Sequence, residues 1–215
     1  MDPALAPYTF SQTLLSRIQN NLDRFSIQPL EHTGLRKAAV AIVITEHTET
    51  GEACVLMTLR PSKLNRHGGQ YALPGGRLDD GEQDTDAALR ELHEELGLEL
   101  ETGSIMGQLD PFPTRSGFRV APIVVATTGP VTLRPDPAEV EQVFHLPFSE
   151  LASPDIPRLQ DSANSDHPVL SAYFPTLGHY MYAPTAAILY QFREIALHGR
   201  STRVAHFDQP TFAWK

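Results

Sequence analysis

The chain has 215 residues, a formal net charge of −9 at pH 7 and a single cysteine. The acidic balance disfavours general binding to nucleic acid or to anionic membranes, and one cysteine cannot form an internal disulfide bond. No apolar run is long enough for a membrane span and the first residues lack the pattern of a signal peptide, so we expect a cytoplasmic protein.

The first half of the chain contains a predicted helix and a predicted hairpin. Apolar residues at helical spacing indicate a helix within residues 10–25. An apolar run from Arg36 to Thr45 indicates a buried strand, and after a polar turn a second strand follows from Cys54 to Arg60. The apolar neighbours of Cys54 predict that its side chain packs in the core. A loop is expected at 61–72.

The second half is expected to continue the sheet and to end in a helix. We predict three more strands, at Ser104–Asp110, Phe118–Thr127 and Val140–Leu146. A helical turn at Pro147–Leu151 leads into residues 152–168, which are polar, loop-like and expected to be the most mobile segment. A short hairpin is expected around Tyr173 and Tyr180, and an amphipathic helix at Pro184–His198. Strands with helices at both ends of the chain indicate an α/β/α sandwich built on a mixed β-sheet.

Three carboxylates fall on one side of a helix predicted within residues 76–98. At 3.6 residues per turn, Glu91, Glu94 and Glu95 lie within an arc of roughly 100°. Like charges at this spacing cost a helix about 0.2–0.5 kcal/mol per pair, unless a cation binds there. Oxygen-rich clusters suit Mg²⁺, whereas the alternative is an ordinary solvated face. Arg90 sits beside Glu94 and can hold its carboxylate by charge-assisted hydrogen bonds. The apolar residues of the opposite arc can pack on a core: Ala88, Leu89, Leu92 and Leu96.

Turn and capping residues predict the bounds of this helix. Residues 74–76, Pro-Gly-Gly, allow a tight backbone turn before it. Asp84 or Thr85 can cap the first turn, and Asp84 is the preferred candidate. Gly97 is placed to end the helix in the left-handed conformation.

The whole segment matches a known motif. The fixed positions of the Nudix box are filled by Gly76, Glu82, Arg90, Glu91, Leu92, Glu94, Glu95, Gly97 and Leu98. The chain therefore resembles the Nudix hydrolases, which implies an α/β/α sandwich with a mixed sheet and hydrolysis of a diphosphate bond. The resemblance further implies a divalent metal cofactor, Mg²⁺ or Mn²⁺, bound by the carboxylates of Glu91, Glu94 and Glu95 and the carbonyl of Gly75. These carboxylates and Arg90 form the expected catalytic set, and the one that accepts a proton from water is left open.

The segments that flank the motif resemble the coenzyme A diphosphatase branch. The similar stretches are 56–60, Leu64 with 66–70, 73–76, 113–120 and 182–189. This resemblance implies coenzyme A or its thioesters as substrate, with 3′,5′-ADP and (acyl-)4′-phosphopantetheine as products. Asn65, Tyr71 and Leu73 depart from the pattern of that branch, so ADP-ribose, dinucleotides and other nucleoside diphosphate derivatives stay open. A nucleotide-sensing module without catalysis is the alternative of a different class.

Basic and acidic residues outside the helix are candidates for further roles. A substrate with several phosphates calls for arginine, which binds phosphate in a forked manner. Glu139 and Glu141 flank Val140, and alternation in a strand would point both to the same side, as additional acid or base groups. For each of these residues an ordinary surface role is the alternative. The substrate-binding candidates are Arg60, Arg66, His67, Arg77, Arg115 and Arg119.

We expect three parts along the chain. Residues 1–34 form a helical extension, residues 35–200 form the Nudix hydrolase domain and residues 201–215 form a C-terminal tail. The expected partner is a small-molecule nucleotide diphosphate, with neither nucleic acid nor a membrane. A homodimer stays open, since dimers are the commonest assembly.

Overall fold

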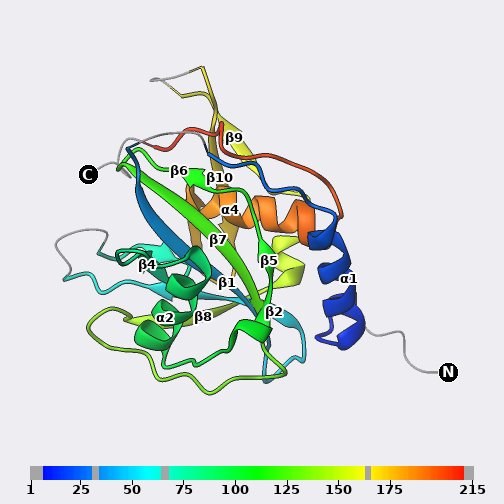
Figure 1. The fold of residues 1–215 in the computed structure, drawn as a ribbon. Coiled ribbons are helices and arrows are strands. Elements are labelled where there is room, and N and C mark those ends of the chain that lie inside the picture. Colours follow the sequence, from blue (N-terminus) through cyan, green and yellow to red (C-terminus); the bar gives the residue numbers. More distant parts are fainter. Residues whose placement is uncertain (1–6, 31–33, 64–67, 163–165, 211–215) are drawn as a thin grey trace.

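A mixed β-sheet lies at the centre of the protein (Figure 1). The computed structural model describes residues 7–30, 34–63, 68–162 and 166–210. Within these residues the central sheet has the order β3-β2-β1-β7-β5, while β4 pairs with β1, β6 with β7 and β8 with β2. β1 and β7 are parallel and the other pairs are antiparallel, so the predicted mixed sheet is confirmed. The strands are β1 (Arg36–Glu46), β2 (Ala53–Leu59), β3 (Tyr71–Ala72), β4 (Gly75–Arg77), β5 (Ile105–Gln108), β6 (Phe112–Pro113), β7 (Phe118–Ala126) and β8 (Gln142–Pro147).

Helices cover both faces of this sheet. Alternate residues of β1 point to opposite faces, and they belong to two separate apolar clusters. Ala39, Ala41 and Val43 pack with residues of α2, whereas Ala38 and Ile42 pack with residues of α1 and α4. The expected α/β/α sandwich is therefore confirmed. The helices are α1 (Gln12–Asp23), α2 (Asp84–Leu96), α3 (Phe148–Leu151) and α4 (Thr185–Phe192), with a 3-10 turn η1 (Thr102–Ser104) and a π-helical turn η2 (Arg193–Leu197).

The predicted β1–β2 hairpin is confirmed, with Ile44 opposite Val55. Cys54 is free and fully buried in β2, as its apolar neighbours predicted. The strand predicted to start at Val140 begins two positions later, at Gln142. The loop expected at 61–72 ends in the short strand β3, which pairs with β2.

A second, smaller sheet was not expected as a separate unit. Its strands are β9 (Arg158–Gln160), β10 (Val169–Phe174) and β11 (His179–Tyr182), all antiparallel. The hairpin predicted around Tyr173 and Tyr180 is confirmed, because these two residues are opposite each other in β10 and β11. The prediction that all of 152–168 is loop-like was wrong, since β9 lies within it. All three side chains of β9 are exposed, so no alternation of apolar and polar residues marked this strand in the sequence. Residues 163–165 lie outside the described part.

The C-terminal helix is buried on most sides rather than amphipathic. The chain is helical from Thr185, but the α-helix ends at Phe192 and continues as the π-helical turn η2. Residues of α4 share one apolar cluster with α1, the central sheet and β10, which surround it. The amphipathic prediction was therefore wrong, because this helix has few exposed positions.

The N-terminal helix α1 also belongs to this core. Ser11 caps it by accepting a hydrogen bond from the N–H of Leu14 at 3.2 Å. Its buried residues lie in the same apolar cluster as β1 and β7, and Asn21 donates to the carbonyl of Ala196 at 2.9 Å. The division at residues 34 and 200 stays a prediction. Among the described helices, none has both the length and the apolar character that crossing a membrane requires.

Candidate active site

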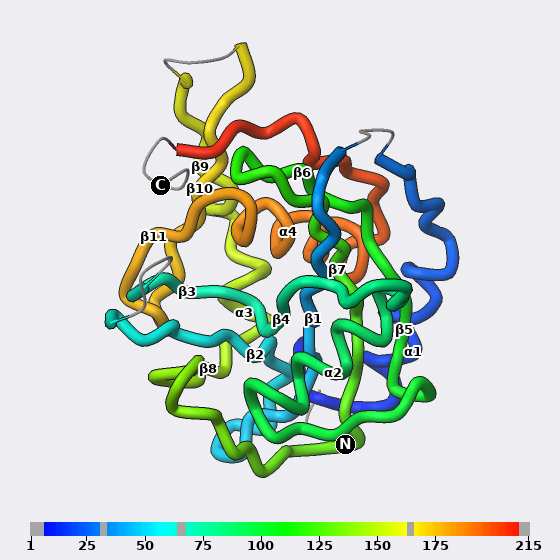
Figure 2. Tube along the Cα trace, turned by 60° about the vertical axis from the view of Figure 1, so that its left-hand side comes forward, coloured from blue at the N-terminus to red at the C-terminus, as the bar shows by residue number. Residues whose placement is uncertain are grey.

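The helix α2 places the acidic residues of the motif beside β4 (Figure 2). Gly97 ends α2 with φ 61°, and its N–H bonds to the carbonyl of His93 at 2.9 Å, as predicted. The predicted cap by Asp84 was wrong. Gln83 holds the cap position without a side-chain hydrogen bond, and Asp84 is the first helical residue. Its carboxylate accepts a hydrogen bond from Arg119 instead, so a tertiary ion pair replaces the local cap.

The two glycines of β4 allow the backbone to approach α2 closely. A Cβ atom on Gly76 would lie 2.3 Å from Oε1 of Glu91, so any larger residue would displace this carboxylate. The N–H of Gly75 donates to Oε2 of Glu95 at 3.2 Å. Pairing of β4 with β1 holds both glycines in place. The glycine turn therefore contacts two of the three predicted carboxylate ligands.

Three carboxylates converge at this turn. Glu91, Glu95 and Glu139 each offer an oxygen, and these oxygens lie within 4.8 Å of one another. Glu95 is almost fully buried, Glu91 is half-buried and Glu139 is exposed. Hard oxygen ligands at this separation fit a divalent cation such as Mg²⁺ or Mn²⁺. We call these three residues the acidic cluster.

Glu139 reaches the acidic cluster because its loop is tied to the C-terminal end of α2. The N–H of Arg134 donates to the carbonyl of Leu96 at 2.7 Å, and that of Asp136 donates to the carbonyl of Glu95 at 2.9 Å. These bonds satisfy carbonyls that a helix end leaves free. The N–H of Glu139 then bonds to the carbonyl of Asp136 at 3.0 Å. The loop thus carries a carboxylate from outside the motif to the glycine turn.

The other predicted carboxylates lie differently. Glu94 is exposed, and its carboxylate is bound by Arg90 at 2.9 Å rather than joining the acidic cluster; its role as a metal ligand stays a prediction. Glu141 accepts a hydrogen bond from the N–H of Ser62 at 3.3 Å. Glu139 and Glu141 both precede the first residue of β8, so strand alternation does not apply to them and their same-side placement stays a prediction.

Arg90 links the motif's acidic residues. Its guanidinium binds Glu82 in a forked manner, with Nε at 2.9 Å from Oε1 and Nη2 at 3.1 Å from Oε2. Nη1 donates to Glu91 at 3.0 Å and to Glu94 at 2.9 Å, which confirms the predicted contact. Nη2 also donates to the carbonyl of Arg77 at 3.0 Å. The hydrogen bond from Arg90 lowers the pKa of Glu82, so this pair stays ionised.

Burial perturbs two carboxylates of the acidic cluster. Burial raises the pKa of Glu95 to about 7, although Arg60 at 3.6 Å and the N–H of Gly75 act in the opposite direction. Burial also raises the pKa of Glu91, against the effect of Arg90. Buried carboxylates with insufficient positive charge nearby are typical of a functional site. A bound divalent cation would favour the ionised form of both groups.

The predicted substrate-binding residues differ in their surroundings. Arg60 lies 3.6 Å from Glu95, so it borders the acidic cluster. Arg77 follows the glycine turn and is exposed. Arg119 pairs with Asp84, as described above. Arg115 binds Asp208 of the C-terminal segment at 2.9 Å. Arg66 and His67 lie outside the described residues.

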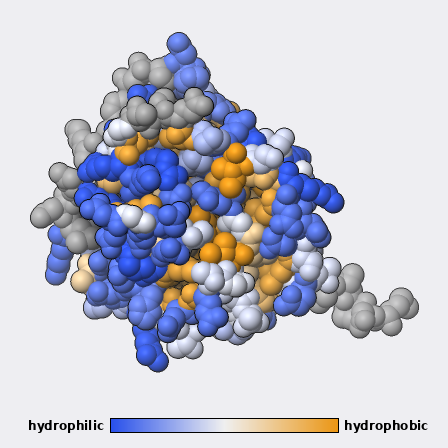
Figure 3. Space-filling model, viewed as in Figure 1, coloured by the Kyte–Doolittle hydropathy of each residue, from blue (hydrophilic) through white to orange (hydrophobic). Residues whose placement is uncertain are grey.

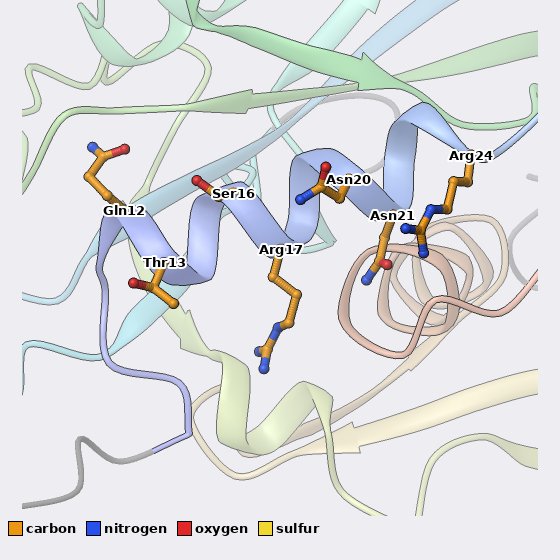
Figure 4. A pocket seen from close by; sticks show the side chains of 7 residues that line it. All are labelled: Gln12, Thr13, Ser16, Arg17, Asn20, Asn21 and Arg24. Atoms are coloured by element: carbon orange, nitrogen blue, oxygen red, sulfur yellow. The ribbon is translucent and has the colours of Figure 1, made fainter.

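Two surface hollows lie apart from the acidic cluster. One runs along α1, and its side chains come from that helix and its C-cap residue Arg24 (Figure 4). The other is lined by residues near the start of β1 and includes Lys37 and Arg119. No residue of the acidic cluster lines either one. The first hollow is lined by Gln12, Thr13, Ser16, Arg17, Asn20, Asn21 and Arg24.

Comparison with known proteins agrees with this geometry. A family model described as NUDIX domain matches residues 34–171. A protein of Shigella flexneri (serotype 5b), named uncharacterized Nudix hydrolase NudL, is 32% identical over 190 residues, which cover 85% of this chain and 91% of NudL. The chain belongs to the Nudix hydrolase family. Members of this family are diphosphohydrolases that generally use divalent metal ions, which the acidic cluster can accommodate.

Two further relatives bear on substrate and fold. The mouse mitochondrial coenzyme A diphosphatase NUDT8 is 39% identical over 121 residues, covering 54% of this chain and 57% of that protein. A crystal structure of a MutT/nudix family protein from Enterococcus faecalis matches with a TM-score of 0.51 at 18% identity, covering 88% of this chain and 76% of that one. The similarity to the Enterococcus faecalis structure supports the Nudix fold and says nothing about the substrate.

Proposed function

We propose that this Nudix hydrolase cleaves the diphosphate bond of coenzyme A or its thioesters, giving 3′,5′-ADP and (acyl-)4′-phosphopantetheine. The observation that carries this choice is the 39% identity to mouse coenzyme A diphosphatase NUDT8. The stretches on either side of the Nudix box support it, because they resemble the same branch. Hydrolysis adds water across the P–O–P bridge: the water oxygen bonds to one phosphorus, and the bridging oxygen leaves with the other.

In this proposal the acidic cluster holds one or more divalent cations, Mg²⁺ or Mn²⁺. A bound cation would lower the pKa of water and offset charge on the phosphoryl oxygens. Glu91 and Glu95 would bind the cation beside the glycine turn, together with the carbonyl of Gly75. Glu139 would be a further ligand or the group that accepts a proton from the attacking water. Glu94 is a ligand that would have to exchange its contact with Arg90 for the cation.

Positive side chains around the acidic cluster would orient the anionic substrate. Arg60 is the nearest of the predicted residues, because its guanidinium already lies 3.6 Å from Glu95. Arginine binds phosphate oxygens in a forked manner, so Arg60 can hold the diphosphate beside the cluster. Arg90 acts differently: by binding Glu82, Glu91 and Glu94 it positions the carboxylates.

A substrate panel with product masses tests the proposal. Purified full-length chain with Mg²⁺ or Mn²⁺ is incubated with coenzyme A, acetyl-coenzyme A, ADP-ribose and a diadenosine polyphosphate. We expect 3′,5′-ADP and the matching phosphopantetheine from the first two compounds. Hydrolysis of ADP-ribose or the dinucleotide without turnover of coenzyme A would refute the substrate assignment, while the family assignment would stand.

A further inference from the structure

Three strands bring two arginines and an aromatic ring together at one end of the sheet, where β1 and β7 begin. Arg36, at the start of β1, is in register with Phe118, at the start of the parallel strand β7. Arg77 of β4 is opposite Ala38, two residues after Arg36. Paired residues, and residues two apart in a strand, share a face. All three side chains are therefore on the same face of the sheet.

The ring of Phe118 holds both guanidinium groups. The Cζ atom of Arg36 lies 4.0 Å from the ring centroid, and that of Arg77 lies 5.2 Å from it. Stacking of this kind orders a guanidinium while leaving its N–H donors free at the edge of the plane. One N–H group of Arg36 donates a hydrogen bond to the carbonyl of Ser116 at 2.9 Å. We call Arg36, Phe118 and Arg77 the arginine platform.

The arginine platform differs from the other arginines near the motif in lacking acidic partners. Arg60, Arg90 and Arg119 each pair with carboxylates of the motif region. Within the part of the chain that the structure describes, neither Arg36 nor Arg77 has a carboxylate within salt-bridge distance. Two like charges near one ring repel each other, and an anion that contacts both reduces that cost. Two neighbouring arginines without a carboxylate partner in the described part are an unusual feature in a chain of net charge −9.

The arginine platform is connected to the acidic cluster by short links. Arg77 directly follows Gly76, the residue whose position leaves room for the carboxylate of Glu91. The carbonyl of Arg77 accepts a hydrogen bond from Arg90, which also binds Glu91. The strand register places the arginine platform on the face of the sheet that carries Ala38, whereas α2 and the acidic cluster lie on the face that carries Ala39, so a ligand that reaches both sites must pass around β4. Hydrophilic side chains gather around α2 and β4 on the face shown in Figure 3.

We propose that the arginine platform binds a second phosphate of the substrate, a phosphomonoester separate from the diphosphate that is hydrolysed. The inference rests on the proposed function for its choice of ligand, because coenzyme A carries such a group at the 3′ position of its ribose. Two guanidinium groups match a dianionic phosphate in charge, and each can donate charge-assisted hydrogen bonds to its oxygens. The diphosphate itself lies at the acidic cluster in this arrangement, and the second phosphate fixes the orientation of the nucleotide.

The test measures binding without turnover. Calorimetric titration of the metal-free full-length chain compares adenosine 3′,5′-bisphosphate with AMP, which lacks only the 3′-phosphate. We expect the bisphosphate to bind about tenfold or more tightly, as two charge-assisted contacts allow. Arg36→Gln and Arg77→Gln should each bring this ratio toward one. Arg36→Lys, which keeps the charge but not the fork, should give an intermediate ratio.

Arg24→Gln serves as the matched control, because Arg24 is an exposed arginine at the C-terminal cap of α1 and its replacement should leave the ratio unchanged. A ratio near one in the wild-type chain would overturn the inference. It would also be overturned if the platform variants weakened both ligands by the same factor, since the arginines would then bind the 5′-phosphate region. If the ratio behaves as expected but coenzyme A is not hydrolysed, the proposed function fails and the platform stands.

Discussion

Glu139 lies outside the Nudix motif, yet an oxygen of its carboxylate is within 4.8 Å of an oxygen of Glu95. Glu95 comes from the last turn of α2, and Glu139 comes from a loop tied to the end of the same helix. The contact joins a buried carboxylate to an exposed one at the glycine turn. This pairing brings a carboxylate from outside the motif to the expected metal site.

Replacing Glu139 should impair the enzyme without unfolding it. Glu139→Gln removes one charge from the acidic cluster, and we expect turnover with Mg²⁺ to fall about tenfold or more, since a ligand or a proton acceptor is lost. The thermal midpoint of the metal-free chain should be unchanged or slightly higher, because repulsion with Glu91 and Glu95 is reduced. Glu101→Gln, at an exposed position before η1, is the control. Equal activity of Glu139→Gln and the control would exclude Glu139 from the site.

Glu95 should make the metal-free protein less stable at high pH. Burial raises its pKa in the folded chain to about 7, whereas an unfolded chain has the ordinary value near 4.5. Between these two values the folded state binds more protons than the unfolded state, so the free energy of unfolding falls as pH rises through this window. The loss amounts to about 3 kcal/mol at most above pH 7. Below about pH 4.5 the carboxyl is protonated in both states and the full stability is present.

The variant Glu95→Gln tests this pH dependence. We expect it to be more stable than the wild-type chain at pH 8 in the absence of metal, with a difference that shrinks by pH 5. Urea unfolding of both proteins at the two pH values measures it. Added Mg²⁺ should stabilise the wild-type chain at pH 8 and stabilise Glu95→Gln much less. A wild-type protein whose stability rises from pH 5 to pH 8 relative to Glu95→Gln would contradict the assignment.

Arg90 should be needed for both stability and activity. Its side chain binds three carboxylates, of Glu82, Glu91 and Glu94, and a carbonyl. Arg90→Lys keeps the charge but loses the fork, so the unfolding free energy should fall by about 1–3 kcal/mol and turnover should fall as well. Arg17→Lys, on the exposed side of α1, should change neither quantity. Chemical denaturation and steady-state kinetics of the two variants provide the comparison.

Glu91 and Glu94 should differ in how a cation reaches them. Both are predicted ligands, and Glu→Gln at either position should lower turnover by about 100-fold or more, since metal stabilisation of phosphoryl charge is worth several kcal/mol. Glu91 already belongs to the acidic cluster, whereas Glu94 is bound to Arg90. We therefore expect Glu91→Gln to weaken Mn²⁺ binding in the absence of substrate more than Glu94→Gln does. Full activity of Glu94→Gln would remove it from the ligand set.

Much of the site could be predicted from local sequence. Spacing along one helix placed Glu91 and Glu95 near each other, and Gly97 ended that helix as a left-handed glycine. The apolar runs of β1 and β2 predicted the hairpin because both strands are buried on both faces. These features depend on residues that are close in the chain.

The features that were missed depend on distant contacts. The prediction that Asp84 caps α2 was wrong because Asp84 pairs with Arg119, which belongs to β7. Glu139 was a candidate from the sequence, but its position beside the motif could not be predicted, because it depends on backbone hydrogen bonds between its loop and the end of α2. The arginine platform was overlooked for the same reason, since strand register brings Arg36 and Phe118 together.

The most direct test of the central claim is crystallographic. Crystals of the full-length chain soaked with Mn²⁺ would be measured at a wavelength where manganese scatters anomalously. We predict an anomalous peak bonded to carboxylate oxygens of Glu91 and Glu95 beside the carbonyl of Gly75. A chain that hydrolyses its substrate with Mn²⁺ while these side chains carry no peak, or while the peak lies elsewhere, would contradict the account.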